Sequence, residues 1–148
     1  MPKLKRNEFP DFAKMGKNIE YMIRKLPTVS GTIAVNFFKD SFTRKGFINK
    51  SFEKWQPRQN DDDLKGSLML VSANLKRSIK KDVGSNYVIV SSDTAYSKAH
   101  NEGLTIRKRS SSFKMPKRQF MGKSEVLMKR IELNFNKQLK AIIKRDMP

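Results

Sequence analysis

The sequence has 148 residues, no cysteine, and a formal net charge of +18 at pH 7 that arises from 32 Lys and Arg against 14 Asp and Glu. A chain of this length usually forms one domain, so we expect a single domain over residues 1–148. The lack of cysteine excludes a disulfide framework and a thiolate metal site. The charge favours a negatively charged neighbour, such as nucleic acid, an acidic protein surface or anionic lipid, although a basic surface that only serves solubility is equally compatible.

The sequence does not indicate secretion or membrane insertion. Residues 1–6 are basic like the start of a signal peptide, but Asn7, Glu8 and Pro10 follow where an apolar stretch is required. No run approaches the roughly 18 apolar residues of a membrane span. We therefore expect no membrane partner.

The beginning of the chain predicts two helices. Apolar residues recur at spacings of three and four from Phe12 to Leu26, which is the pattern of one helix face. Asp11 is a suitable N-cap and Pro27 a suitable stop. A second helical pattern runs from about Ser30 to Arg44, and we expect the two helices to pack together.

The segment from Phe47 to Lys65 predicts a long loop that is mobile around residues 56–66. It carries an aromatic anchor at Trp55 and an acidic triplet at Asp61–Asp63. Hard cations such as Mg²⁺ or Ca²⁺ prefer carboxylate oxygens, but consecutive side chains point in different directions and no calcium-loop spacing follows. We interpret the triplet as a solvated loop tip and expect no metal site.

The middle of the chain predicts short elements. Ser72 could cap a short helix over residues 73–78, and β-branched residues on both sides of a turn at residues 83–90 predict a hairpin. Tyr96–His100 has the pattern of one helical turn, which Gly103 would end.

A short strand at Leu104–Arg107 leads into a basic arm at residues 107–123, which we expect to be a loop or an extended segment. The arm has seven basic side chains and no acidic one: Arg107, Lys108, Arg109, Lys114, Lys117, Arg118 and Lys123. Cations bind phosphates, and Phe113 and Phe120 could stack on bases. No signature of a sequence-specific nucleic-acid-binding module accompanies the charge, so only sequence-independent contact is indicated. After the arm, Ser124 would cap a final helix whose apolar residues keep helical spacing to Ile142.

The sequence offers little for catalysis. His100 is the only histidine; it would share a face of a helical turn with Tyr96, and Glu102 follows closely. A lone histidine is more often a packed or hydrogen-bonded residue, and a nuclease or other hydrolase would need His100 to converge with the acidic triplet. One histidine without cysteine nearly excludes a zinc site, and no glycine-rich phosphate loop is present. We expect no enzyme activity, no catalytic residue and no cofactor.

Three motifs occur in order along the chain. The first comprises Trp55 and the run LVSANLKRSI at Leu70–Ile79, the second is YSKAHNEG at Tyr96–Gly103, and the third is PKRQFMG at Pro116–Gly122. The ordered set, with the helix that follows it, resembles the phage virion morphogenesis family of Mu G-like tail-completion proteins and their neck-protein relatives. Ala73 occupies a position where the family usually has Gly, and Ser97 one where it usually has Ala.

The resemblance implies an α+β fold, in which long N- and C-terminal helices flank a small antiparallel β-sheet. It implies a structural protein of a tailed bacteriophage or prophage that completes the tail or joins it to the head, without catalysis. We expect a ring of identical subunits that contacts connector or tail-tube proteins, and non-specifically contacts packaged DNA. The chain would be a virion component that is present in the bacterial cytoplasm during assembly. The alternative is a sequence-independent nucleic-acid-binding protein.

Two sets of residues are candidates for these contacts. Nine motif residues would have interface or structural roles: Trp55, Leu75, Ser78, Tyr96, His100, Gly103, Pro116, Arg118 and Phe120. A basic patch would comprise Arg107, Lys108, Arg109, Lys114, Lys117 and Lys123. Arg118 could form a fork onto a carboxylate or carbonyl of a neighbour while Phe120 anchors in an apolar pocket, and Tyr96 and His100 would be buried hydrogen-bonding residues at the base of the arm. Equally, all four could stabilise only the core of their own chain.

Overall fold

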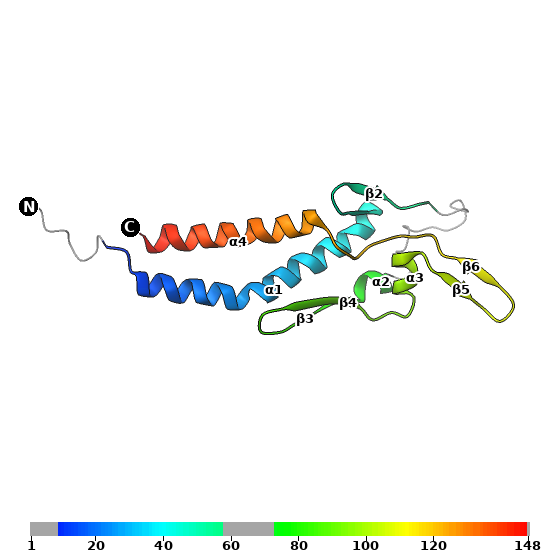
Figure 1. The fold of residues 1–148 in the computed structure, drawn as a ribbon, viewed down its shortest axis with the longest axis horizontal. Helices are drawn as coiled ribbons and strands as arrows, with labels where there is room; N and C mark the ends of the chain where they lie inside the picture. The colour runs from blue at the N-terminus through cyan, green and yellow to red at the C-terminus, as the bar shows by residue number, and fades with distance from the viewer. Residues whose placement is uncertain (1–8, 58–72, 148) are drawn as a thin grey trace, which may run out of the picture.

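The computed structural model describes residues 9–57 and 73–147. Two long antiparallel helices lie side by side, and three small β-hairpins lie along or beyond them (Figure 1). The elements are α1 (Phe12–Arg44), β1 (Gly46–Ile48), β2 (Phe52–Lys54), α2 (Asn74–Arg77), β3 (Ile79–Val83), β4 (Val88–Ser92), α3 (Ser97–Glu102), β5 (Thr105–Arg107), β6 (Ser112–Lys114) and α4 (Glu125–Asp146). The α+β class is as expected, but the strands described here form three separate two-stranded antiparallel sheets instead of one. No helix in the described ranges is long and apolar enough to cross a membrane.

Helix α1 is continuous through Pro27, so the expected break into two helices was wrong. The Asp11 N-cap is confirmed, because its carboxylate accepts a hydrogen bond of 2.9 Å from the Lys14 amide. A proline inside a helix removes one backbone hydrogen bond and bends the axis, and α1 changes direction part-way along (Figure 1). The helix continues because packing against α4 on one side and against β3 and β4 on the other outweighs the lost bond.

The hairpin β1–β2 replaces the start of the expected long loop after Phe47. It lies directly after α1, where the Trp55 amide donates to the Lys45 carbonyl at 2.8 Å. Gly46 permits the tight pairing, since a Cβ there would be 2.6 Å from the Glu53 carbonyl oxygen. The remainder of that segment, including Asp61–Asp63, and the expected cap Ser72 lie outside the described residues.

The hairpin β3–β4 has the expected position, with Val83 paired to Val88 next to the turn. It lies close against α1 at Gly31, where an added Cβ would be 2.6 Å from a methyl group of Val88. Lys81 extends from β3 to the same part of α1 and donates to the Thr28 carbonyl at 3.1 Å. The hairpin thus covers the side of α1 that α4 leaves uncovered.

Helix α4 begins at the expected cap, where the Ser124 hydroxyl accepts a 3.1 Å hydrogen bond from the Leu127 amide. At its other end the buried Asp146 carboxylate accepts from Arg145 Nε at 2.9 Å and from Asn18 Nδ2 at 2.6 Å. The hydrogen bonds from Arg145 and then Asn18 lower the pKa of Asp146 to about 2. Asp146 therefore ties the end of α4 to the first half of α1.

This tie predicts acid sensitivity. The pKa of Asp146 in the folded chain is below the value of about 3.9 of an unfolded Asp. The ionised carboxylate therefore contributes fully to the free energy of unfolding above about pH 3.9, and this contribution is lost as the pH falls through about 2. In Asp146→Asn, the free energy of unfolding should be lower near neutral pH and should fall less between about pH 4.5 and about pH 2.5 than in the unmodified chain. Glu132→Gln, which removes an exposed carboxylate from the same helix, is the control. An unchanged pH profile in Asp146→Asn would contradict the assignment.

Candidate functional site

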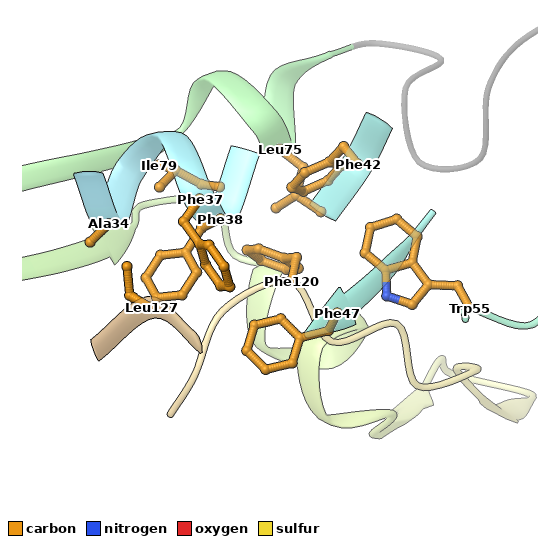
Figure 2. Close-up of a cluster of buried hydrophobic side chains, with 10 residues drawn as sticks. All are labelled: Ala34, Phe37, Phe38, Phe42, Phe47, Trp55, Leu75, Ile79, Phe120 and Leu127. Atoms are coloured by element: carbon orange, nitrogen blue, oxygen red, sulfur yellow. The ribbon is translucent and has the colours of Figure 1, made fainter. Parts of the chain in front are cut away.

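The three motifs meet around Phe120, which is the centre of the apolar core. Its side chain is 1% exposed and its ring lies 5.2 Å from the ring of Phe42. Trp55 of the first motif contacts Phe42 edge to face at 5.5 Å. Figure 2 shows Phe120 between Phe42 and Phe47, with Leu75 beside Phe42 and Ile79 near Phe37 in the same cluster. Aromatic side chains from α1, β1 and the third motif thus form one interior.

The third motif has no helix or strand over Pro116–Gly122, so its buried backbone groups need other partners. Asn101 Oδ1 accepts from the amides of both Phe120 and Met121 at 3.0 Å. The Trp55 indole donates to the Gln119 carbonyl at 2.7 Å, and the Arg118 amide donates to the His100 carbonyl at 2.8 Å. Residues of the first and second motifs therefore hold the backbone of the third.

Arg118 is directed into its own chain. The side chain is 6% exposed, and its guanidinium donates to the carbonyls of Gln56 at 3.2 Å and Pro57 at 3.5 Å. We expected Arg118 and Phe120 to engage a neighbouring subunit or, equally, their own core. The structure gives both residues intramolecular partners, and any interface role for the motif residues remains a prediction.

Tyr96 and His100 differ from the expected pair of buried hydrogen-bonding side chains. Tyr96 is 40% exposed and contacts the His100 ring edge to face at 6.0 Å. The base of the arm is held by the backbone carbonyl of His100 instead of by its imidazole. His100 Nδ1 is buried and makes no hydrogen bond within the described residues. Burial, and secondarily the charge of Arg118, lowers the pKa of His100.

The remaining motif residues shape the local backbone. Leu75 is buried in the core, and the Ser78 hydroxyl donates to the Leu75 carbonyl at 2.8 Å. Gly103 ends α3 in the left-handed conformation at φ +72, and a Cβ there would be 3.1 Å from the backbone nitrogen of Lys117. Pro116 is half-buried at the start of the third motif. Leu75, Ser78 and Gly103 thus make close contacts within their own chain.

Ala73 occupies the left-handed region at φ +51, which explains why glycine suits this position in the family that the motif resembles. A non-glycine residue pays roughly 1 kcal/mol or more for this conformation. The chain keeps the turn before α2 despite that cost.

The short strand expected at Leu104–Arg107 is present as β5, and it forms a hairpin with β6, which lies where we expected a loop or an extended segment. All six residues of the predicted basic patch are exposed. Arg107 lies on β5 and Lys114 on β6, Lys108 and Arg109 lie in the turn, and Lys117 and Lys123 follow. Within the described ranges, no group of three His, Asp and Glu side chains could hold a metal ion.

The double role of Asn101 predicts a stability effect. Asn101→Ala leaves the Phe120 and Met121 amides without their acceptor, so the free energy of unfolding should fall by about 1–3 kcal/mol. Asn101→Asp keeps an acceptor oxygen and should restore most of the loss. Asn136→Ala, at an exposed helical position, should change stability by less than about 0.5 kcal/mol. Equal effects of the two alanine variants in urea unfolding would show that Asn101 does not hold the motif.

The lowered pKa of His100 predicts a second pH effect. Because the folded chain disfavours the protonated imidazole, the unfolded chain binds more protons once the pH falls below about 6.5, and stability decreases. The free energy of unfolding should therefore be lower at about pH 5.5 than at about pH 7.5, and His100→Gln should reduce this difference. A difference that is unchanged in the variant would assign the effect to other groups.

Comparison with known proteins agrees with the motifs. Residues 50–140 match the model of the phage virion morphogenesis family. The matched range includes Trp55 and all of the second and third motifs, and it covers more than half of the chain. Searches among curated proteins and among solved structures found no match. With this match over more than half of its length, and with its three motifs in contact in the fold, the chain belongs to the phage virion morphogenesis family.

Proposed function

We propose that the chain completes the tail of a tailed bacteriophage or prophage, or joins the tail to the head, as a ring of identical subunits. Family membership supports a role in building the virion. The observation that carries the proposal is that the motif residues are committed to their own fold. Phe120 fills the core, Asn101 accepts from backbone amides, and Arg118 donates to backbone carbonyls. The chain would thus act through its surface and perform no bond-making chemistry.

Exposed apolar side chains on the surface could form the contacts between subunits. Several large apolar side chains of the helix pair are exposed, among them Phe12, Ile23, Met128 and Leu133. Exposed apolar side chains that form a patch mark protein interaction sites. Repeated contact between two different surfaces of identical subunits closes a ring when the rotation permits it. Connector or tail-tube proteins of the same particle would cover the exposed apolar surface that the contacts between subunits leave free. The chain would be part of the virion and would be present in the host cytoplasm during assembly.

The exposed basic arm supports a second candidate, a sequence-independent nucleic-acid-binding protein. The two functions differ in what the isolated chain does. A dedicated nucleic-acid-binding protein must bind as a single chain, whereas a ring subunit needs little affinity before assembly. Non-specific binding in the range of about 10⁻⁴ to 10⁻⁶ M at physiological salt is compatible with the ring subunit.

Sedimentation with the neighbouring particle proteins tests the proposal. The purified chain should form larger species as its concentration rises, or should assemble when tail-tube or connector protein of the same phage is added at low salt. Deletion of the gene should yield filled heads and tails that do not join or are incomplete. A chain that remains monomeric with every such protein, together with infectious particles from the deletion, would refute the proposal.

A further inference from the structure

The hairpin β5–β6 is a two-faced ribbon. It lies at the end of the molecule opposite to the chain termini (Figure 1). Its register pairs Thr105 with Lys114, Ile106 with Phe113 and Arg107 with Ser112. Paired residues share a face and successive residues alternate between faces. One face therefore carries Thr105, Arg107, Ser112 and Lys114, whereas the other carries Ile106 and Phe113.

The polar face and its turn contain only side chains that can donate hydrogen bonds. The turn adds Lys108, Arg109, Ser110 and Ser111, so the set has four cations and four hydroxyls. No Asp or Glu occurs between Thr105 and Lys117. All eight side chains are exposed. None of the ion pairs found within residues 9–57 and 73–147 involves a cation of this ribbon.

We propose that this polar face and turn bind the phosphate backbone of double-stranded DNA without reading its sequence. Phosphate oxygens accept hydrogen bonds from Arg, Lys, Ser and Thr, which are the residue types present here. A two-stranded ribbon is also narrow enough to follow a groove of the duplex. Ile106 and Phe113 point away from the polar face, so they would not insert between bases while it is engaged. The inference rests on the second candidate function above, for which it names the ligand and the face of the arm that binds it, and it does not depend on ring assembly.

Helix α4 provides a matched control for the overall charge. Lys137, Lys140 and Lys144 are exposed, and their spacing of three and four places them on one side of the helix. If DNA binding reflects only the net charge of +18, removal of these three cations should weaken it as much as removal of three ribbon cations. If the ribbon is the site, the two removals should differ.

Fluorescence anisotropy with a labelled mixed-sequence duplex of about 30 base pairs tests the proposal at about 50 mM and about 200 mM salt. The ribbon variant is Arg107→Gln, Lys108→Gln, Arg109→Gln, and the control is Lys137→Gln, Lys140→Gln, Lys144→Gln. At low salt the ribbon variant should lose about tenfold or more in affinity, and the slope of log K against log salt should shrink by about 2 to 3. The control should lose less than about threefold. Equal losses in both variants, or an unchanged ribbon variant, would overturn the proposal.

Competition separates DNA from an acidic protein partner. Unlabelled duplex should displace the labelled duplex at a far lower charge concentration than polyglutamate does, because the hydroxyls and cations would match phosphate groups. Equal displacement by polyglutamate would overturn the assignment to phosphate. Circular dichroism should show unchanged melting of both variants, since all six substituted residues are exposed. If the ribbon does not bind DNA, the sedimentation result with tail proteins is unaffected, so the two proposals can fail separately.

Discussion

The contact of Phe120 with Phe42 joins the end of α1 to the start of α4, because Phe42 lies near the end of α1 and Phe120 lies just before α4. The segment around Phe120 has neither helix nor strand, so it stays in the core only if its amides find other partners. Asn101 accepts from the Phe120 and Met121 amides, and the Trp55 indole donates to the Gln119 carbonyl.

Caps, turns and helix ends were predicted correctly where interactions between residues close in the sequence determine them. The Ser124 cap, the β3–β4 turn and the left-handed Gly103 all follow from neighbouring residues and appear as expected. Pro27 was misinterpreted because tertiary packing on both sides of α1 exceeds the cost of one backbone bond. The expected short strand at Leu104–Arg107 is present as β5, whereas β1, β2 and β6 were missed because three residues are too few to show an alternating pattern.

The sequence did not determine the partners of the candidate residues. An arginine beside an aromatic residue suits an interface as well as a core, so the sequence left both open for Arg118 and Phe120; the fold places both inside. Asn101 escaped attention, although its place between His100 and Gly103 within a motif was a usable signal. The helix pair exposes apolar side chains such as Leu133 together with cations such as Lys140, and the ribbon exposes cations together with Phe113.

The fold and the proposed function both require the third motif to be buried in its own chain. Native-state hydrogen exchange measured by NMR reports this directly for the amides of Phe120 and Met121, which donate to Asn101. We predict that both amides exchange only through global unfolding, with protection equal to that of the most protected α1 amides around Phe38. Exchange at the rate of an exposed turn amide such as Ser110, while α1 stays protected, would show that the motif is not held in the core and would contradict the account.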